Sequence, residues 1–367
     1  MEIIKKTKNI INYVEENLKT FSESDVNEVD ALIFSWLSYY RLSEEVYKKD
    51  KFIPIKLKEI YTAKYFKEMT YDIFDSESSV KLLSRIASSP RFRDVDIFYY
   101  VQNTDKTIEK QFSAMTFKID KNKYVVAFRG TDHTFVGWKE DFNMSYISHV
   151  PAQIDAKKYL NNVSKKLKGD YYVTGHSKGG NLAVYASAFS NDKVKSNIKT
   201  IFNFDGPSLN KTLINTDEYI GIIKKEKKYV PQSSVVGMCF EKTSKYHIIK
   251  SDAVGVFQHN PFSWEVVSKS LKTLKDSTFD SKMFKNGINA LIDTLSEEEL
   301  KLFTNTIYET VEATDTDTVE KFLENIKSTL PIVFNRIGKF DNKQKELLNK
   351  IGTIFIKESF RNIFVKN

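Results

Sequence analysis

Apolar residues recur along this chain at two spacings, and the change between them outlines its organisation. A helical spacing predicts helices over residues 10–18, 31–37, 79–87 and 151–168. Short continuous apolar runs predict strands over residues 95–101, 112–119, 124–128, 171–174, 200–204 and 235–240. A turn at residues 120–122 predicts that the second and third of these strands form a hairpin. Strands that alternate with helices predict an α/β fold with a mainly parallel sheet covered on both faces.

Beyond about residue 270, only the helical spacing remains. Ser296 and Glu299 form a capping-box pattern before an apolar stripe over residues 300–311. A second stripe comprises Val319, Phe322, Leu323, Ile326 and Leu330 and is expected to end at Pro331. A third comprises Leu347, Leu348, Ile351 and Ile354. We therefore expect an α/β domain over residues 1–270, with a helical lead-in over about 1–65, and a helical module over 271–367 of undetermined role.

Composition narrows the class of protein. The 367 residues are sufficient for one large core and an appendage. The single cysteine, Cys239, excludes disulfide bonds within the chain and fits a reducing compartment. The first residues carry charges in every turn and lack the apolar core of a signal peptide, and no run is long enough for a transmembrane segment. The sequence therefore predicts a cytoplasmic protein.

The formal net charge is +8, and lysines gather at residues 165–168 and 224–228. Such runs are usually solvated surfaces, and no nucleic-acid-binding motif accompanies them, so we expect no nucleic-acid partner. Peripheral contact with an anionic membrane surface and the oligomeric state stay open. The sequence has no HExxH pattern, cysteine pair, GxGxxG after a strand or Walker A lysine, so we expect no metal and no cofactor.

The stretch YYVTGHSKGG at residues 171–180 has the order of a strand, a GxSxG turn and a helix. This order is typical of a nucleophile elbow, in which a strained turn exposes a serine, here Ser177, at the edge of the sheet. Gly175 and Gly179 leave room where neighbouring side chains would clash. The alternative is a glycine-rich turn whose serine only caps the following helix.

A second segment supports the catalytic interpretation. The apolar strand at residues 124–128 ends in Arg129-Gly130-Thr131. Acyl transfer requires two N–H donors for the oxyanion, of which one comes from the residue after the nucleophile and one from a loop after an earlier strand. Lys178 and Thr131 occupy those two positions. Without the elbow, the same segment would be interpreted as a turn with a surface arginine.

These motifs resemble those of the class 3 lipases, which carry an FRGT-like oxyanion strand and a GHSxGG elbow. Over residues 25–270 the sequence is more similar to bacterial lipase-like hydrolases of the Mbeg type. The matching stretches are NEVDALIFSWLSYY, QFSAMTF, FRGTDHTFVGWKEDF, FDGPSLN and FQHNPFSW. The resemblance implies an α/β-hydrolase fold. It also implies that residues 134–148, with Phe135, Trp138, Phe142, Met144 and Tyr146, form a lid over an acyl pocket, although a packed loop fits them equally.

The chain contains five histidines from which a general base could come. His133 and His149 precede the serine, against the order expected of this fold, and His176 lies inside the elbow, where we interpret it as structural. His247 lies in a strand-like run. His259 lies in a loop after the last expected strand, where a base must arrive to reach the serine hydroxyl, and the resemblance also favours this histidine. We prefer His259.

The carboxylate that would orient this base is less obvious. Class 3 lipases supply an aspartate from a region that corresponds to residues 228–236, where this chain has Gln232, Ser233 and Ser234 instead. Asp205, at the carboxyl end of the strand after the elbow helix, is our preferred acid. Asp252, shortly before His259, is the alternative acid. If Asp205 has no catalytic role, it is an ordinary turn aspartate before Gly-Pro.

Together these residues predict a serine hydrolase that cleaves a carboxylic ester, such as a lipid or lysophospholipid, through an acyl-enzyme on Ser177. A thioesterase or acyltransferase would use the same residues. A hydrolase-fold protein without turnover, serving as a binding or regulatory module, is the alternative from a different class, and the absent acid at residues 228–236 is its main support.

Overall fold

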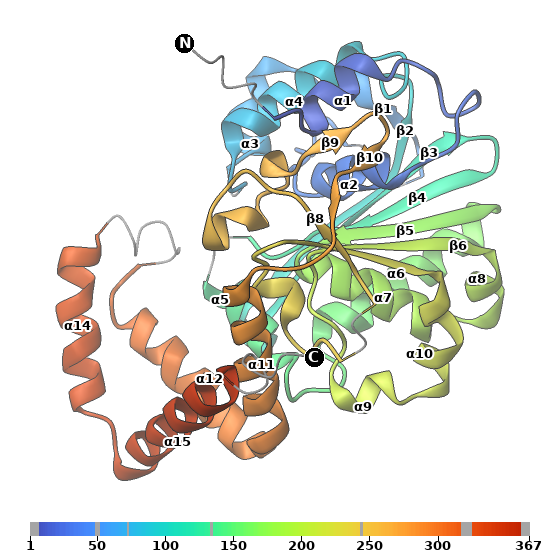
Figure 1. The fold of residues 1–367 in the computed structure, drawn as a ribbon. Coiled ribbons are helices and arrows are strands. Elements are labelled where there is room, and N and C mark those ends of the chain that lie inside the picture. Colours follow the sequence, from blue (N-terminus) through green and yellow to red (C-terminus); the bar gives the residue numbers. More distant parts are fainter. Residues whose placement is uncertain are drawn as a thin grey trace.

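The computed structural model describes residues 7–47, 52–71, 73–132, 135–242, 245–316 and 325–360, without the side chains of residues 106, 135–138 and 326. At the centre of this described part is a nine-stranded sheet in the order β1-β2-β3-β4-β5-β6-β7-β8-β11 (Figure 1). Its strands are β1 (Ile55–Lys56), β2 (Asp96–Asp105), β3 (Lys110–Asp120), β4 (Lys123–Phe128), β5 (Asp170–His176), β6 (Ile198–Phe204), β7 (Glu226–Pro231), β8 (His247–Ile249) and β11 (Thr273–Leu274). A separate two-stranded ribbon contains β9 (Val266–Val267) and β10 (Ser270–Leu271).

The middle of the sheet is parallel from β4 to β8, and the flanking strands are antiparallel. Strands β3 and β4 form the expected hairpin, in which Thr116 pairs with Val126. The expectation of an α/β-hydrolase fold with a mainly parallel sheet is therefore confirmed. The last strand, β11, follows residue 270, so the sheet extends beyond the expected end of the α/β part.

Helices cover both faces of the sheet, as Figure 1 shows. The N-terminal helices are α1 (Ile10–Glu16), α2 (Glu28–Leu37), α3 (Phe66–Met69) and α4 (Ser76–Ser88). The helices of the middle of the chain are α5 (Phe135–Asn143), α6 (Pro151–Lys166), α7 (Lys178–Phe189), α8 (Asp192–Asn197), α9 (Lys211–Ile214) and α10 (Asp217–Ile222). The 3₁₀ turns are η1 (Leu57–Ile60), η2 (Ala63–Tyr65), η3 (Lys106–Ile108), η4 (Ile223–Lys225), η5 (Val236–Met238), η6 (Gly255–His259) and η7 (Pro261–Ser263).

Alternation along β4 explains how the two helical layers are held. Val125 and Ala127 belong to one buried cluster, together with residues of α1, α2 and α4. Val126 and Phe128 point to the opposite face and belong to a second cluster with α6 and α7. Because both faces of the strand are buried, its sequence is a continuous apolar run instead of an alternating one.

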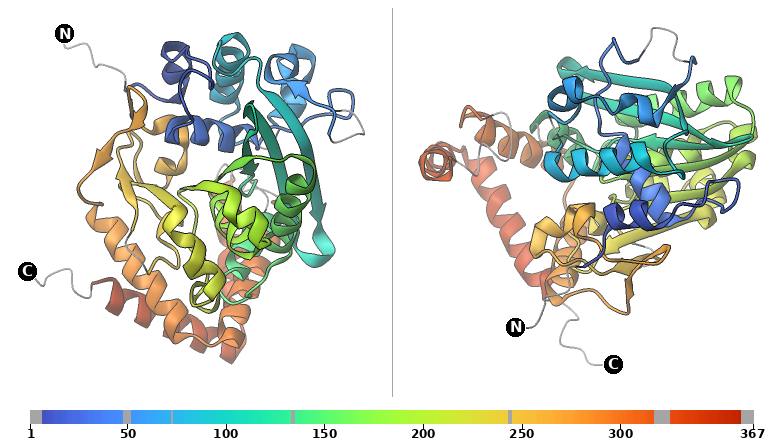
Figure 2. Two further views of the ribbon diagram at one scale, coloured as in Figure 1. Left: turned by 90° about the vertical axis from the view of Figure 1, so that its right-hand side faces the viewer. Right: turned by 90° about the horizontal axis from the view of Figure 1, so that it is seen from above.

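The helices of the C-terminal part are α11 (Phe279–Thr294), α12 (Glu297–Glu312), α14 (Ile326–Gly338) and α15 (Asn342–Ser359). The expected capping box is present at the start of α12, where the side chains of Ser296 and Glu299 each accept from the other's backbone N–H. Leu291, Leu300 and Leu347 share a small apolar cluster that joins α11, α12 and α15. Figure 2 shows from two directions that α12, α14 and α15 project from one end of the sheet domain.

Two expectations for the secondary structure are wrong. The expected strand at residues 235–240 is instead the turn η5, in which the Gly237 N–H donates to the carboxylate of Asp205 and Phe240 has a φ of 62°. This tertiary hydrogen bond overrides the strand propensity of the local apolar run. Pro331 does not end a helix but lies inside α14. A proline within a helix removes one backbone hydrogen bond without always ending the helix.

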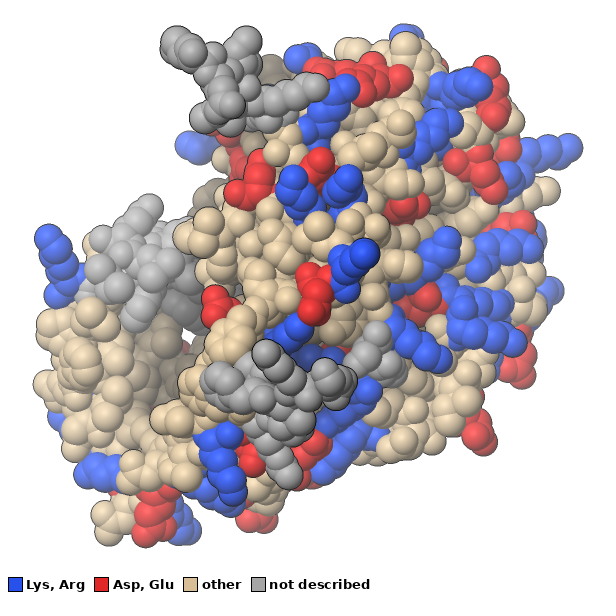
Figure 3. All heavy atoms as spheres, viewed as in Figure 1, with Lys and Arg blue, Asp and Glu red and all other residues tan. Residues whose placement is uncertain are grey.

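Of the second C-terminal stripe, Val319, Phe322, Leu323 and the side chain of Ile326 lie outside the described residues. Leu330 is 39% exposed and therefore not part of a core. It shares the surface of α14 with other exposed apolar side chains, Ile332, Phe334 and Ile337. Figure 3 shows this side of the molecule as largely uncharged, whereas Lys, Arg, Asp and Glu are interspersed over the rest of the visible face.

Candidate active site

Three parallel strands bring the predicted site residues to one edge of the sheet. Phe128 of β4 pairs with Gly175 of β5, and His176 of β5 pairs with Phe204 of β6, so the carboxyl ends of these strands align. Ser177 and Asp205 follow β5 and β6 directly, and Thr131 follows β4 by a short turn. The carboxyl edge of a parallel sheet is where α/β proteins commonly bind their ligands.

Ser177 occupies the strained position expected of a nucleophile elbow. Its φ is 59° and its ψ is −136°, a backbone conformation that non-glycine residues rarely adopt. The Ser177 N–H donates to the carbonyl of Phe204 at 2.9 Å, which holds the turn against β6. A methyl group on Gly175 would lie 2.0 Å from the carbonyl oxygen of Gly179, so the turn closes only with glycine there.

The hydroxyl of Ser177 is not used by the turn itself. It makes no capping hydrogen bond to α7, although Ser177 is the residue that precedes this helix. The alternative in which this serine serves only as a helix cap is therefore not what the structure contains. No hydrogen bond joins it to His259 among the described residues, and catalytic hydrogen bonds are often long before substrate binds.

The predicted oxyanion loop, Arg129-Gly130-Thr131, lies directly against the predicted elbow. A methyl group on Gly130 would lie 3.0 Å from Cβ of Ser177 and 2.7 Å from the carbonyl oxygen of His176. The Thr131 hydroxyl donates to Oδ2 of Asp141 at 2.6 Å, so α5 fixes the orientation of this residue. Lys178 is the first residue of α7, and the first N–H groups of a helix have no acceptor within the helix. The backbone N–H groups of Thr131 and Lys178 thus belong to two segments in contact.

The side chain of Lys178 is fully buried in an ion pair. Its ammonium group donates to Oε2 of Glu140 at 2.9 Å and to the carbonyl of Gln111 at 3.1 Å. Glu140 also accepts from the backbone N–H of Gln111 and of Ala152, each at 3.1 Å. A buried carboxylate with this many donors is well satisfied, and it joins α5 to β3, α6 and the elbow helix.

Asp141, next to this ion pair, is a half-buried carboxylate with a raised pKa, and its Oδ1 lies 4.0 Å from Nζ of Lys178. Burial raises the pKa of Asp141 to about 6, although the nearby ammonium group of Lys178 opposes the shift. Its Oδ1 atom is buried and has no hydrogen-bond partner in the described part of the chain. A carboxylate whose pKa is raised by burial binds its proton more tightly in the folded protein than in the unfolded chain.

This property predicts a pH-dependent contribution to stability. The folded pKa of about 6 exceeds the ordinary value of 3.8, so the free energy of unfolding falls as the pH rises from about 4 through 6. Asp141→Asn removes that loss, and we expect the variant to gain about 1–3 kcal/mol relative to the wild type over this interval. Urea unfolding of both proteins at pH 4.5 and pH 7.5 measures this difference in the free energy of unfolding. Thr131→Val keeps the carboxylate and should keep the pH dependence, whereas an Asp141→Asn difference that does not change with pH would contradict the assignment.

His259 and Asp205 form a direct hydrogen bond across the site. Nδ1 of His259 lies 2.6 Å from Oδ2 of Asp205, whose side chain is 1% exposed. Asp205 has a φ of 48° and its N–H donates to the carbonyl of Tyr229 at 2.8 Å, so its backbone is held by β7. Since Nδ1 faces the carboxylate, Nε2 of His259 stays available to another group.

The segment that lacks an acid supports Asp205 instead. The Ser234 hydroxyl and the Gly237 N–H both donate to Oδ1 of Asp205. The Ser233 N–H donates to the side chain of Gln258 at 2.9 Å, which holds the residue directly before His259. Ser233 and Ser234 of this segment, together with Gly237 directly after it, thus contribute donors to the aspartate and the histidine loop in place of a carboxylate.

The other candidates lie elsewhere or are engaged. Asp252 is exposed, and its carboxylate makes no hydrogen bond among the described residues. His149 pairs with the hydroxyl of Tyr185 at 2.7 Å, and His247 is exposed on β8. His133 lies outside the described residues.

His176 is buried and in contact with the pair that the structure brings together. The ring centroids of His176 and His259 are 4.5 Å apart, and Nε2 of His176 lies 2.9 Å from the carbonyl oxygen of His259. Sequence reasoning did not identify this contact or the contributions of Tyr39, Glu140 and Ser234. Glu140 and Asp141 lie in the stretch FRGTDHTFVGWKEDF, which the resemblance singles out without assigning either residue a role.

The expected lid segment is partly packed in the structure. Thr134 and the side chains of Phe135 and Trp138 lie outside the described residues. Met144 is 2% exposed in the core, and Tyr146 packs on the apolar cluster of the C-terminal helices, whereas Phe142 is 37% exposed. Lys139 lies over the ring of Tyr308, so α12 contacts α5. At least the carboxyl-terminal half of the expected lid segment, residues 134–148, therefore packs against the rest of the protein.

Among the described residues, no helix is long and apolar enough to cross a membrane, and no three or more His, Cys, Asp or Glu side chains are grouped so that they could hold a metal ion.

Comparison with solved structures finds several lipases. An M37 lipase is 19% identical, with 59% of this chain and 70% of that chain covered and a TM-score of 0.37. A mutant form of the protein MDLA of Penicillium cyclopium is 16% identical, with 70% and 90% covered and a TM-score of 0.38. A lipase of Rhizomucor miehei in complex with its propeptide is 15% identical, with 66% and 88% covered and a TM-score of 0.34. These likenesses concern the fold alone.

No curated protein matches the sequence. A family model, described as Mbeg1-like, matches residues 86–309, which is more than half of the chain. The match reaches further than the expected resemblance, because it includes α11 and most of α12, and it begins later, within α4. The chain belongs to the Mbeg1-like family.

Proposed function

We propose that this protein is a serine hydrolase that cleaves a carboxylic ester through an acyl-enzyme on Ser177. The observation that carries the proposal is the hydrogen bond between Nδ1 of His259 and Oδ2 of Asp205, next to a serine with a φ of 59°. A base oriented by a carboxylate and a serine exposed by backbone strain are the two parts that acyl transfer requires of side chains.

In the first step, Oγ of Ser177 attacks the acyl carbonyl carbon while Nε2 of His259 takes the hydroxyl proton. Asp205 holds the imidazole in the required tautomer and stabilises the imidazolium. The backbone N–H groups of Thr131 and Lys178 donate to the oxyanion, an effect of about 3–4 kcal/mol for each donor. The tetrahedral intermediate then collapses, the ester C–O bond breaks and the alcohol leaves with the proton from His259.

Water completes the cycle by attacking the acyl-enzyme. His259 accepts a proton from this water, and the second tetrahedral intermediate releases the carboxylic acid and restores the Ser177 hydroxyl. Each step uses only groups of this chain and water.

The proposed substrate class is an ester of lipid or lysophospholipid type. A thioester, or an acyl acceptor other than water, would engage the same residues, and product analysis separates these reactions. The case for a protein without turnover rested on the absent acid at residues 228–236. With Asp205 bonded to His259, that absence no longer favours it. We keep the cytoplasm as the proposed compartment, on the basis of the single cysteine.

A fluorophosphonate probe tests the proposal directly, since it reacts covalently with an activated serine. We expect stoichiometric labelling of the wild-type protein at Ser177, together with hydrolysis of a p-nitrophenyl ester, and neither with Ser177→Ala. Ser187→Ala is the matched control, because Ser187 is a fully buried serine of α7 whose hydroxyl donates to the carbonyl of Ala183 and contacts none of the proposed catalytic residues. A folded wild-type protein that is neither labelled nor active would exclude the hydrolase.

A further inference from the structure

His176 precedes the nucleophile and is placed to act on the base. It is the last residue of β5, its side chain is 3% exposed, and Nε2 lies 2.9 Å from the carbonyl oxygen of His259. A carbonyl oxygen only accepts hydrogen bonds, so Nε2 of His176 must carry the proton. This contact fixes the backbone of His259, whereas Asp205 fixes its ring.

Tyr39 completes the arrangement from the opposite side. It follows α2, its hydroxyl oxygen lies 3.0 Å from Nδ1 of His176, and a methyl group on Gly130 would lie 2.0 Å from that oxygen. Because Nε2 carries the only ring proton of a neutral imidazole, Nδ1 accepts the hydroxyl proton of Tyr39. Burial lowers the pKa of His176 well below its ordinary value and raises that of Tyr39, so both groups stay neutral.

The loop that carries His259 needs such an anchor. Three apolar side chains before it, Val254, Val256 and Phe257, are 81%, 65% and 58% exposed and contribute little packing. Inside the loop, Gln258 bonds to Ser233 and Ala253, and its carbonyl accepts from the indole N–H of Trp264. At His259 itself, the described contacts are the side chain of Asp205 and the ring of His176.

We propose that Tyr39 and His176 form a positioning pair that holds the backbone of His259 and thereby aims its imidazole at Ser177. The proposal rests on the esterase function proposed above and adds two residues that touch neither substrate nor reacting atoms. Tyr39 also contacts the proposed oxyanion loop at Gly130, so one buried pair fixes the positions of the base, the elbow and that loop relative to one another.

The test compares variants that keep or remove the two hydrogen bonds. Leucine at position 176 fills space without donating, whereas the amide of glutamine can donate to the His259 carbonyl and accept from Tyr39. We expect His176→Leu to lower kcat for a p-nitrophenyl ester by about 100-fold, with KM changed by less than about 3-fold. His176→Gln should recover activity to within about 10-fold of the wild type, and Tyr39→Phe should lose about 10-fold.

Thr174→Val is the matched control. Thr174 lies two residues earlier on the same face of β5, is fully buried, and donates to the carbonyl of Ala31 instead of the site. We expect a loss of thermal stability comparable to that of His176→Leu but an unchanged kcat. A folded His176→Leu that keeps kcat within about 3-fold, or a Thr174→Val that loses as much kcat as His176→Leu, would overturn the proposal.

A spectroscopic measurement tests the positioning pair without requiring the protein to be an active enzyme. In protein labelled with [¹⁵N]histidine, the five histidines give a small spectrum in which each tautomer is distinguishable. We expect His176 as the Nε2–H tautomer and a His259 Nδ1–H signal that broadens or shifts in His176→Leu but not in Thr174→Val. An Nδ1–H tautomer at His176, or a His259 signal unaffected by His176→Leu, contradicts the positioning pair. An inactive wild type with the expected spectrum contradicts the hydrolase alone.

Discussion

Asp205→Asn lowers the kcat of ester hydrolysis by about 10⁴-fold while the protein stays folded. Two donors, the Ser234 hydroxyl and the Gly237 N–H, point at Oδ1 of Asp205. In the variant, these donors hold the amide oxygen at that position, so the amide nitrogen takes the place of Oδ2 and faces Nδ1 of His259. A donor at that place stabilises the tautomer with its proton on Nε2, which cannot accept the proton of Ser177.

The control for this variant is Asp252→Asn, which removes an exposed carboxylate from the same stretch of chain. We expect its kcat to stay within about 2-fold of the wild type, in line with an ordinary surface substitution. Full activity of Asp205→Asn alongside an inactive Asp252→Asn would transfer the role of the acid to Asp252. Steady-state kinetics with a p-nitrophenyl ester measures all three proteins.

The sequence predicts most of the sheet because the parallel strands leave a strong local signal. Residues 124–128 and 171–174 are continuous apolar runs next to glycine turns, and both are strands in the structure. Residues 235–240 carry the same kind of run but form η5. Their conformation is set by a hydrogen bond to Asp205, which is distant in sequence and leaves no local pattern.

The same distinction separates the parts of the site that could be predicted from the rest. Ser177, Thr131 and Lys178 could be proposed from the sequence because the predicted elbow and the predicted oxyanion loop each occupy one short segment. The contact between Tyr39 and His176 joins residues from α2 and β5, and a buried tyrosine after an apolar helix is indistinguishable from core. Glu140 is similar, because a carboxylate on a helix is usually exposed, and only its buried lysine partner reveals its role.

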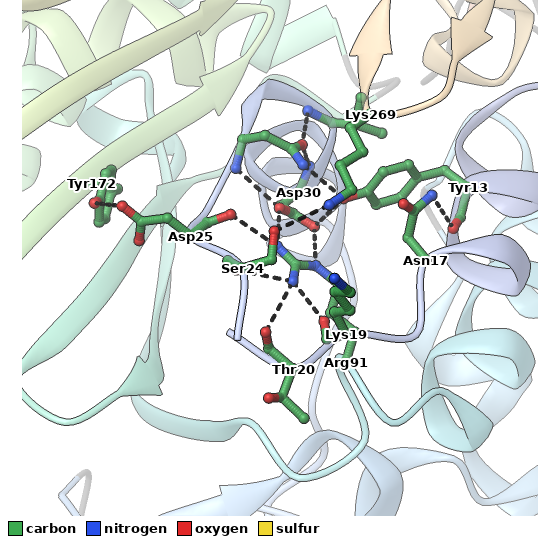
Figure 4. Close-up of polar contacts among 12 residues, drawn as sticks. Tyr13, Asn17, Lys19, Thr20, Ser24, Asp25, Asp30, Arg91, Tyr172 and Lys269 are labelled. Carbon is green, nitrogen blue, oxygen red and sulfur yellow. Dashed lines mark hydrogen bonds and ion pairs between the residues drawn. The ribbon is translucent and has the colours of Figure 1, made fainter. Parts of the chain in front are cut away.

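Tyr39 directly follows the N-terminal helix α2, and a buried ion pair joins this helix to the turn between α4 and β2. Arg91 contacts Asp30 through two nitrogens, at 2.8 and 2.6 Å, and both side chains are almost completely buried (Figure 4). The remaining donors of Arg91 reach the backbone carbonyls of residues 19, 20, 24 and 25. Tyr13 adds a hydroxyl that donates to Asp30 at 2.8 Å. Asp30 lies in α2, so this network holds the helix that precedes Tyr39.

Arg91→Ala is therefore expected to lower the free energy of unfolding by about 3–5 kcal/mol, because it leaves the Asp30 carboxylate buried without its counter-ion. Arg93→Ala is the matched control. Arg93 is the same residue type two positions later, its side chain is 45% exposed, and its contact with Asp94 is 3.5 Å long. Exposed pairs of this kind contribute about 0–1 kcal/mol.

Urea unfolding of the three proteins at pH 7 measures the difference. Adding Asp30→Asn to Arg91→Ala should recover part of the loss, since the double variant no longer buries an unpaired charge. If Arg91→Ala costs no more than Arg93→Ala, the network does not stabilise the fold. A full loss that Asp30→Asn leaves unchanged would instead assign the effect to the backbone carbonyls that Arg91 holds, because those carbonyls lose their donors in both variants.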